Sequence, residues 1–165
     1  MLGVMTDETA FAEIDPRLAA MLSTDPVADF LGIEFATIRA GYARATMKVT
    51  ERLLNAPGTA HGGVMMALVD VVHAAVSNSH GTLAVAQDVH TEFLNAGALG
   101  DTMVCEGVEI NRTGRTAVYR IDVHSFGDKY PDGRHIATAL ARVFRIGTPW
   151  VIEPEVQSES ATAGA

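Results

Sequence analysis

The residues Asn55-Ala56-Pro57-Gly58-Thr59-Ala60-His61-Gly62-Gly63 lead directly into Val64-Met65-Met66-Ala67-Leu68-Val69-Asp70. The first stretch has the composition of a turn-rich loop, and the second begins a long apolar helix that we expect from about His61 to Ser79. This helix has almost no polar face, so we expect other elements to enclose it. Asp70 interrupts the apolar run, and a carboxylate in such surroundings costs free energy unless it is paired or used. The segment therefore carries the candidate chemistry of the chain.

Patterns typical of β-strands flank the helix on both sides. Two strands are expected before it and four after it, at 33–38, 42–49, 83–94, 102–112, 115–126 and 135–146. In the second strand apolar and polar residues alternate, which is typical of an antiparallel strand with one buried face. One helix covers a sheet of about six strands only if the sheet curves around it. We therefore expect an α+β fold, a curved antiparallel sheet around one long central helix, whose open edges favour pairing with another copy.

The composition divides the 165 residues into three parts. Residues 1–30 are expected to form a helical extension, in which Asp15 and Asp25 cap short helices. Residues 31–147 are expected to form the α+β domain. Residues 148–165 are rich in Pro, Glu, Ser, Thr and Ala, so we expect a disordered tail.

Charge and cysteine content exclude several classes of protein. The formal net charge of -8 argues against a nucleic-acid partner, which needs a basic face. No apolar run approaches the roughly 20 residues that span a bilayer, and the acidic residues near the N-terminus are unlike a signal peptide. Cys105 is the only cysteine, and its apolar neighbours predict a buried strand thiol. We expect a cytoplasmic protein with no membrane partner, and no metal, because the histidines lack metal-ligand spacing.

The start of the helix and its carboxylate are suited to attack on a carbonyl group. A helix that begins at Gly62-Gly63 presents free N–H groups at the positive end of its dipole, where a carbonyl oxygen is polarised as in an oxyanion hole. Asp70 is suited to activate water or to attack directly. Asn55 is a candidate for orienting the water or the carboxylate, and His61 for donating to the leaving group. Together these residues predict hydrolysis of an activated acyl group.

The spacing within the helix predicts that one chain does not complete the site. Asp70 follows His61 by nine residues, which corresponds to roughly 13 Å along the helix axis. A reacting carbon lies within about 3–3.5 Å of each catalytic group in a productive pose. If both ends of this segment act on one carbon, the site combines the loop and helix start of one subunit with Asp70 of a second.

Around these residues the chain resembles the hotdog-fold acyl-CoA thioesterases of the phenylacetate-degradation type, within the 4-hydroxybenzoyl-CoA thioesterase superfamily. The resemblance covers roughly residues 27–146. It rests on Asn55, Pro57-Gly58-Thr59, His61-Gly62-Gly63, Asp70, Asn78-Ser79, Glu92-Phe93-Leu94, Gly100-Asp101 and Gly114-Arg115-Thr116. It implies a hotdog fold assembled as homodimers and commonly as tetramers, each a dimer of dimers.

The resemblance also implies roles for individual residues. The N–H of Gly62 would polarise a thioester carbonyl, and Asp70 of the neighbouring subunit would act as base or nucleophile. Asn55 and His61 would assist with the water and the leaving group. Coenzyme A would be part of the substrate, so no separate cofactor is expected.

Three further residues are candidate substrate contacts. Arg112 and Arg115 flank a predicted hairpin, and arginine binds phosphate groups such as those of coenzyme A well. Gly63 stands beside Gly62, where a glycine allows close approach of a substrate to the backbone.

The chain departs from the family pattern at two places. Many relatives have Ser or Thr near position 86 to help hold the water, whereas this chain has Ala86. Either Gln87 or Asp88 substitutes, or the water is held in another way. Asn95-Ala96 stands where relatives often have Arg-Pro, which removes one expected coenzyme contact.

The sequence thus predicts an acyl-CoA thioesterase that hydrolyses a small CoA thioester, with aryl-acetyl-CoA as a candidate substrate, at a site shared between two subunits. Two alternatives use the same fold. A non-catalytic acyl-CoA-binding sensor would need neither Asp70 nor Asn55, because binding alone needs no base. A hotdog dehydratase would require a different placement of Asp and His, and an Asp in mid-helix suits hydrolysis better.

Overall fold

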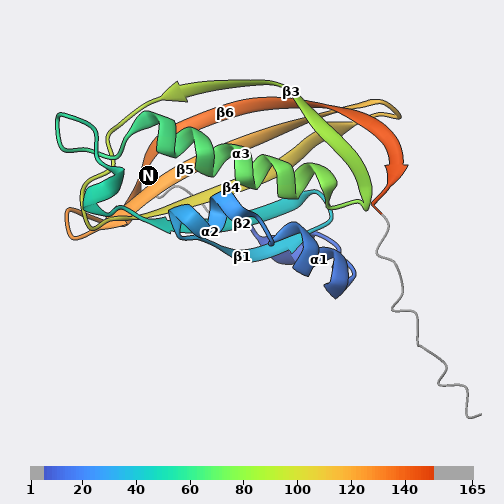
Figure 1. Cartoon of the computed structure of the whole chain (residues 1–165), viewed down its shortest axis with the longest axis horizontal. Coiled ribbons are helices and arrows are strands. Elements are labelled where there is room, and N and C mark those ends of the chain that lie inside the picture. The colour runs from blue at the N-terminus through green and yellow to red at the C-terminus, as the bar shows by residue number, and fades with distance from the viewer. Residues whose placement is uncertain (1–5, 151–165) are drawn as a thin grey trace, which may run out of the picture.

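The computed structural model describes residues 6–150 (Figure 1). The elements are η1 Glu8–Ala10, α1 Pro16–Leu22, α2 Pro26–Leu31, β1 Ile33–Arg39, β2 Tyr42–Lys48, η2 Glu51–Leu53, α3 Gly62–Asn78, β3 Thr82–Phe93, β4 Thr102–Arg112, β5 Thr116–Gly127 and β6 Tyr130–Pro149. The strands form one antiparallel sheet in the order β1-β2-β4-β5-β6-β3. Figure 1 shows this sheet curving around α3. The predicted α+β hotdog architecture is confirmed.

The core lies between α3 and the concave face of the sheet. On β5 the side chains alternate, so that Tyr119, Ile121 and Val123 are fully buried against α3 while their neighbours point to the opposite face. Leu68 and Val72 of α3 fill the centre of this core and are also fully buried. Every second residue of the strands and the residues on one face of α3 therefore contribute their side chains to one apolar layer.

The helix and the sheet approach each other most closely at Gly107 of β4. An ideal Cβ at Gly107 would lie 3.0 Å from Cγ1 of Val72 and 3.2 Å from Cγ1 of Val76. Those distances are shorter than ordinary carbon contacts, so only a residue without a side chain lets α3 lie this close to β4. Gly107 therefore fixes the depth at which the helix sits.

The first part of the N-terminal extension, Glu8 to Phe11, packs on the sheet face opposite α3, whereas α1 and α2 contact α3 itself. The ring of Phe11 stacks on Tyr42 at a centroid distance of 5.0 Å, and Glu8 pairs with Arg44 at 2.7 Å. Under this cover the carboxylate of Glu106 is buried and accepts a hydrogen bond of 2.6 Å from the Tyr42 hydroxyl. The extension thus shields part of β2 and β4 from water.

The helix caps follow the sequence predictions. The side chain of Asp15 accepts from the N–H of Arg17, and that of Asp25 accepts from the N–H groups of Val27 and Ala28. Gly81 follows α3 with a φ of 71°, the left-handed conformation that glycine adopts most easily.

Two boundaries differ from the prediction. β6 begins at Tyr130, five residues earlier than expected, because Gly133 takes its positive φ of 86° inside the strand and not in a long loop. At its other end β6 runs to Pro149, beyond the predicted start of the tail at residue 148. The remainder of the predicted tail, residues 151–165, lies outside the described residues.

Cys105 is fully buried on β4, which confirms the predicted strand thiol. Burial raises the pKa of its thiol, and the charges of Asp122 and Glu106 act in the same direction. Among residues 6–150, no helix combines the length and the apolar character needed to cross a membrane.

His73 is a buried polar residue in the middle of α3. Its ring packs at 5.6 Å from that of Tyr119, and its Nε2 has no hydrogen-bond partner among the described residues. Burial lowers the pKa of His73, although the charges of Asp70 and Asp88 partly oppose this shift. The folded protein therefore favours the neutral imidazole.

Replacing Gly107 by alanine should destabilise the fold by about 1–3 kcal/mol, because the new methyl group overpacks the contact with Val72 and Val76. Urea unfolding of the purified variant measures this change. Gly114→Ala is the matched control, since nothing lies within 4 Å of its Cβ position. Equal stability of the two variants would contradict the close approach.

The free energy of unfolding should fall as the pH drops below about 6.5, where the unfolded chain protonates His73 and the folded chain resists protonation. Above that pH the imidazole is neutral in both states, so this contribution is complete. His73→Phe should flatten the dependence between about pH 7 and pH 5, as measured by urea midpoints. The exposed His90→Gln is the control, and a slope unchanged by His73→Phe would contradict this assignment.

Candidate functional site

The loop before α3 is held in shape by Asn55. Its Oδ1 accepts from the N–H of Thr59 at 2.9 Å, and its Nδ2 donates to the Thr59 hydroxyl at 2.9 Å. The backbone closes the same turn, since the N–H of Asn55 donates to the carbonyl of Thr59 at 2.8 Å. The N–H of Ala60 then donates to the carbonyl of Gly97 at 2.9 Å, which ties the loop to the segment after β3. The Asn55 side chain thus shapes the loop that carries the candidate site.

A cavity of about 320 Å³ opens between this loop, the start of α3 and the end of β3. Its lining mixes polar and apolar groups and comprises Asn55, Thr59, Ala60, Gly62, Met65, Phe93, Leu94, Asn95 and Ala96. Two predicted site residues, Asn55 and Gly62, therefore meet in one cavity.

The N-terminus of α3 leaves one backbone donor at this cavity. The carbonyl of His61 accepts from the N–H groups of Val64 and Met65 at 3.0 and 3.1 Å. The N–H of Gly63 donates to Nδ1 of His61 at 2.9 Å. The N–H of Gly62 makes no hydrogen bond with any group of residues 6–150. An unused donor at the positive end of the helix dipole thus borders this cavity.

His61 acts in this structure as the N-cap of α3. Because its Nδ1 accepts the Gly63 hydrogen bond, the ring proton of the neutral imidazole is assigned to Nε2. The side chain is exposed and does not line the cavity. Gly63 is likewise exposed and its N–H is occupied by His61. The roles predicted for His61 and Gly63 toward a substrate stay predictions.

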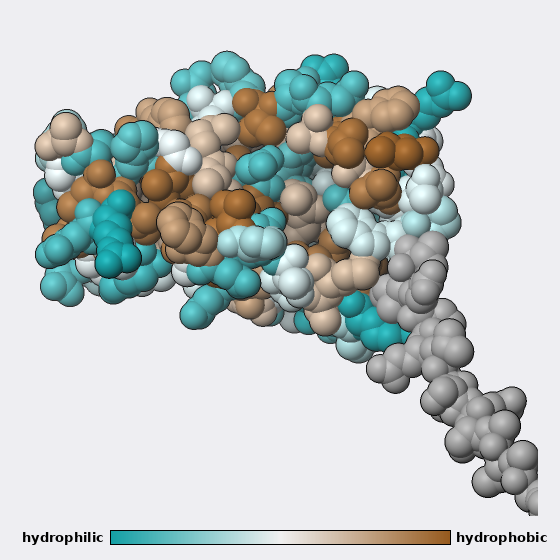
Figure 2. Space-filling model, viewed as in Figure 1, coloured by the Kyte–Doolittle hydropathy of each residue, from teal (hydrophilic) through white to brown (hydrophobic). Residues whose placement is uncertain are grey.

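Asp70 is exposed, which corrects the expectation that α3 is enclosed on all sides. Its neighbours Val69 and Val71 are buried, but Asp70 shares an uncovered stripe of the helix with Gly63 and Ala74. The sheet wraps one side of α3 only. Figure 2 shows apolar residues gathered in a band across the middle of the face that carries α3.

The structure of one chain does not bring Asp70 to Gly62. Eight residues separate them along α3, or about 12 Å of helix rise. Asp70 does not line the cavity that contains Gly62. The separation between Asp70 and the start of α3 that the sequence predicts is therefore found in the folded chain.

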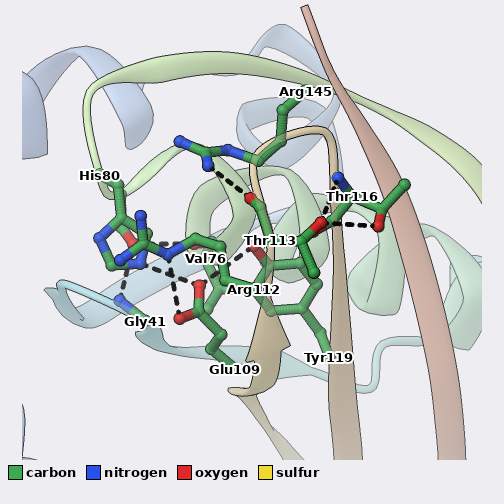
Figure 3. Close-up of polar contacts among 10 residues, drawn as sticks. Gly41, Val76, His80, Glu109, Arg112, Thr113, Thr116, Tyr119 and Arg145 are labelled. Carbon is green, nitrogen blue, oxygen red and sulfur yellow. Dashed lines mark hydrogen bonds and ion pairs between the residues drawn. The ribbon is translucent and has the colours of Figure 1, made fainter. Parts of the chain in front are cut away.

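Arg112 lies beside the opposite end of α3 (Figure 3), and Arg115 follows it in the connection between β4 and β5. In Figure 3 the carboxylate of Glu109 lies between His80 and Arg112, at 2.9 Å from Nε2 of His80 and 3.3 Å from Nε of Arg112. His80 follows the end of α3, so this hairpin and the Gly62 cavity are far apart within one chain. The two predicted coenzyme contacts are not part of the cavity.

The positions that depart from the family pattern have new partners. Asp88 pairs with Arg142 at 2.8 Å, whereas Gln87 is exposed at an irregularity in the pairing of β3 with β6. Asn95 lines the cavity, and its side chain donates to the carbonyl of His135 at 2.8 Å and accepts from Arg134.

Sequence reasoning assigned no site role to Phe93 or Met65. Both line the cavity, and the ring of Phe93 lies against Gly62, with Cζ 3.4 Å from the position of an ideal Cβ there. Phe93 is the last residue of β3 and is 51% exposed. The sequence shows Phe93 as an aromatic residue at the end of a predicted strand. Only the fold shows that this strand end lies beside the start of α3.

Comparison with known proteins agrees with this architecture. The pattern of the thioesterase superfamily matches residues 57–131, which contain most of the loop, α3 and the strands β3, β4 and β5. The acyl-coenzyme A thioesterase PaaI of Escherichia coli is 36% identical over 104 residues, 63% of this chain and 74% of that protein.

Solved structures give the same relationship. The structure of the Escherichia coli PaaI protein from the phenylacetic acid degradation operon superposes with a TM-score of 0.73 and 31% identity, covering 79% of this chain and 91% of that one. A Streptococcus mutans protein solved with acetyl-CoA bound has a TM-score of 0.65 and 27% identity, covering 71% of this chain and 90% of that one. The chain therefore belongs to the thioesterase superfamily, and within it to the hotdog-fold thioesterases of the PaaI type.

Proposed function

We propose that this thioesterase hydrolyses small acyl-CoA thioesters, aryl-acetyl-CoA among them, at a site shared between two subunits. One observation carries the proposal. The unused N–H of Gly62 borders the cavity at the start of α3, while the carboxylate of Asp70 lies on the uncovered side of the same helix, about 12 Å further along. A second chain is the natural source of a carboxylate for each cavity.

The chemistry follows from these two groups. The thioester carbonyl oxygen accepts a hydrogen bond from Gly62, and the helix dipole stabilises its developing negative charge. Asp70 of the second subunit takes a proton from water while the water oxygen bonds to the carbonyl carbon. When the tetrahedral species collapses, the C–S bond breaks, the thiolate of coenzyme A leaves, and the proton passes to it. The products are the free acid and coenzyme A.

The surface around α3 supports association of two chains. β3 is an edge strand of the sheet, so its outer backbone groups are open to pairing. The uncovered side of α3 carries the partly exposed residues Met66 and Ala67 beside Asp70. A two-fold axis near β3 would place each α3 beside its copy, and each Asp70 toward the other cavity.

The same arrangement gives Arg112 and Arg115 a role. The hairpin lies beyond Asp70 toward the C-terminal end of α3, about 14 Å of helix rise from Asp70 to Ser79. Coenzyme A is a long, extended molecule with phosphates far from its sulfur. The hairpin of the subunit that donates Asp70 is therefore the source we propose for the phosphate contacts, and a neighbour of this fold was solved with acetyl-CoA bound.

Asp70→Asn should lower kcat for acyl-CoA hydrolysis at least about a hundredfold, a barrier increase of about 2.7 kcal/mol, because an amide cannot take the proton from water. Release of free coenzyme A thiol measures the rate, with phenylacetyl-, benzoyl- and short-chain acyl-CoA as substrates. Asp132→Asn, which changes an exposed carboxylate near the start of β6, is the control. Unchanged turnover in Asp70→Asn would remove Asp70 from the mechanism.

Mixing two inactive variants tests the shared site directly. Gly62→Ala folds, because its Cβ meets Phe93 at an ordinary contact distance, but the methyl group obstructs the carbonyl position. When unfolded Gly62→Ala and Asp70→Asn chains are refolded together, half of the dimers are mixed and hold one complete site of two, so activity should return to about a quarter of wild type. Activity that does not return on mixing, with dimers present by sedimentation, would rule out the shared site.

A further inference from the structure

Phe93 stands at the one place where the free edge of the sheet meets the start of α3. Three atoms at the tip of its ring, Cζ, Cε1 and Cε2, lie 3.4 to 3.8 Å from the Cβ position of Gly62. The ring therefore points at the backbone that offers the unused N–H, with only the missing glycine side chain between them. A group bound at that N–H would lie close to the ring.

The ring is exposed to water despite its apolar character. Phe93 is 51% exposed and the adjoining Leu94 is 47% exposed, while Met65, on the other side of the cavity, is buried. Covering the Phe93 ring with a hydrocarbon group removes apolar surface from water on both partners. The cavity thus favours an apolar group directly beside the candidate carbonyl position.

The polar groups of the cavity are already occupied. Asn55 and Thr59 hydrogen-bond to each other, and Asn95 is bonded to the carbonyl of His135 and to Arg134. None of the described residues that line the cavity carries a charge. A charged acyl group would lose part of its water there without gaining a partner of opposite charge.

We propose that Phe93 is the residue that sets acyl specificity, forming the wall against which an uncharged hydrocarbon acyl group packs and limiting its length. This inference rests on the proposed acyl-CoA hydrolysis. Phe93 is a wall of the acyl site and takes no part in proton transfer. Its size therefore determines which acyl group is accepted, without determining whether hydrolysis occurs.

The test compares kcat/KM for butyryl-CoA and octanoyl-CoA in the wild type, Phe93→Ala and Phe93→Trp. Phe93→Ala opens the wall and should raise the octanoyl-to-butyryl ratio about tenfold or more, because each misfitting methylene group is worth a sizeable factor. Phe93→Trp fills the cavity and should move the ratio in the opposite direction. Phe144→Ala, a partly exposed phenylalanine on β6 outside the cavity, is the matched control and should leave the ratio unchanged.

A second comparison tests the exclusion of charge. Succinyl-CoA and valeryl-CoA have acyl groups of nearly equal length, and the wild type should prefer the uncharged valeryl group by about a hundredfold or more, since the cavity offers the carboxylate no partner. Equal rates for this pair, or a ratio in Phe93→Ala that matches Phe144→Ala, would overturn the assignment of Phe93 while leaving thioester hydrolysis intact. A wild type that cleaves no CoA thioester would instead overturn the proposed function and this inference together.

Discussion

A single helix has to cover the concave side of a six-stranded sheet. The close contact between α3 and Gly107 of β4 allows the helix to lie deep enough in the sheet to do so. The missing side chain lets Val72 and Val76 rest on the backbone of β4. With the helix this deep, the strands on either side can curve toward it and bury their alternate residues. Everything else in the molecule, including the position of the cavity, is set by where α3 lies in that curved sheet.

The same constraint leaves one side of the helix without cover. A sheet that wraps around a helix from one side cannot also close over its back, so apolar residues and Asp70 remain at the surface of a single chain. Within the N-terminal extension, Glu8 and Phe11 pack on the far face of the sheet, and α1 and α2 contact α3 but leave Asp70 exposed. The core of the fold is therefore closed, but the uncovered side of α3 stays exposed. This is the side on which the proposed mechanism needs the Asp70 carboxylate of a second chain.

Local patterns in the sequence predicted those features that depend on local geometry. The limits of α3 differ by one residue at each end from the predicted ones, and the capping roles of Asp15 and Asp25 are confirmed, because periodicity and cap preference act over a few residues. The exposure of Asp70 was not predicted, since an apolar run does not tell which side of a helix the sheet covers.

Contacts between distant segments were also beyond the sequence. Phe93 reaches Gly62 only because β3 crosses the whole sheet edge and ends beside the start of α3. Arg134 reaches Asn95 only because β6 pairs with β3. No pattern within either segment contains these contacts, because they depend on the order of strands in the sheet.

The burial of Cys105 has a practical consequence for the enzymology of this protein. It is the only thiol of the chain, and inside the core it is both inaccessible and held in its protonated form, which does not react with disulfide reagents. A thiol-specific dye added to the folded protein therefore records only coenzyme A as it is released. Once the chain unfolds, the same dye gains one equivalent of signal per subunit, so a single reagent follows both turnover and the loss of the fold.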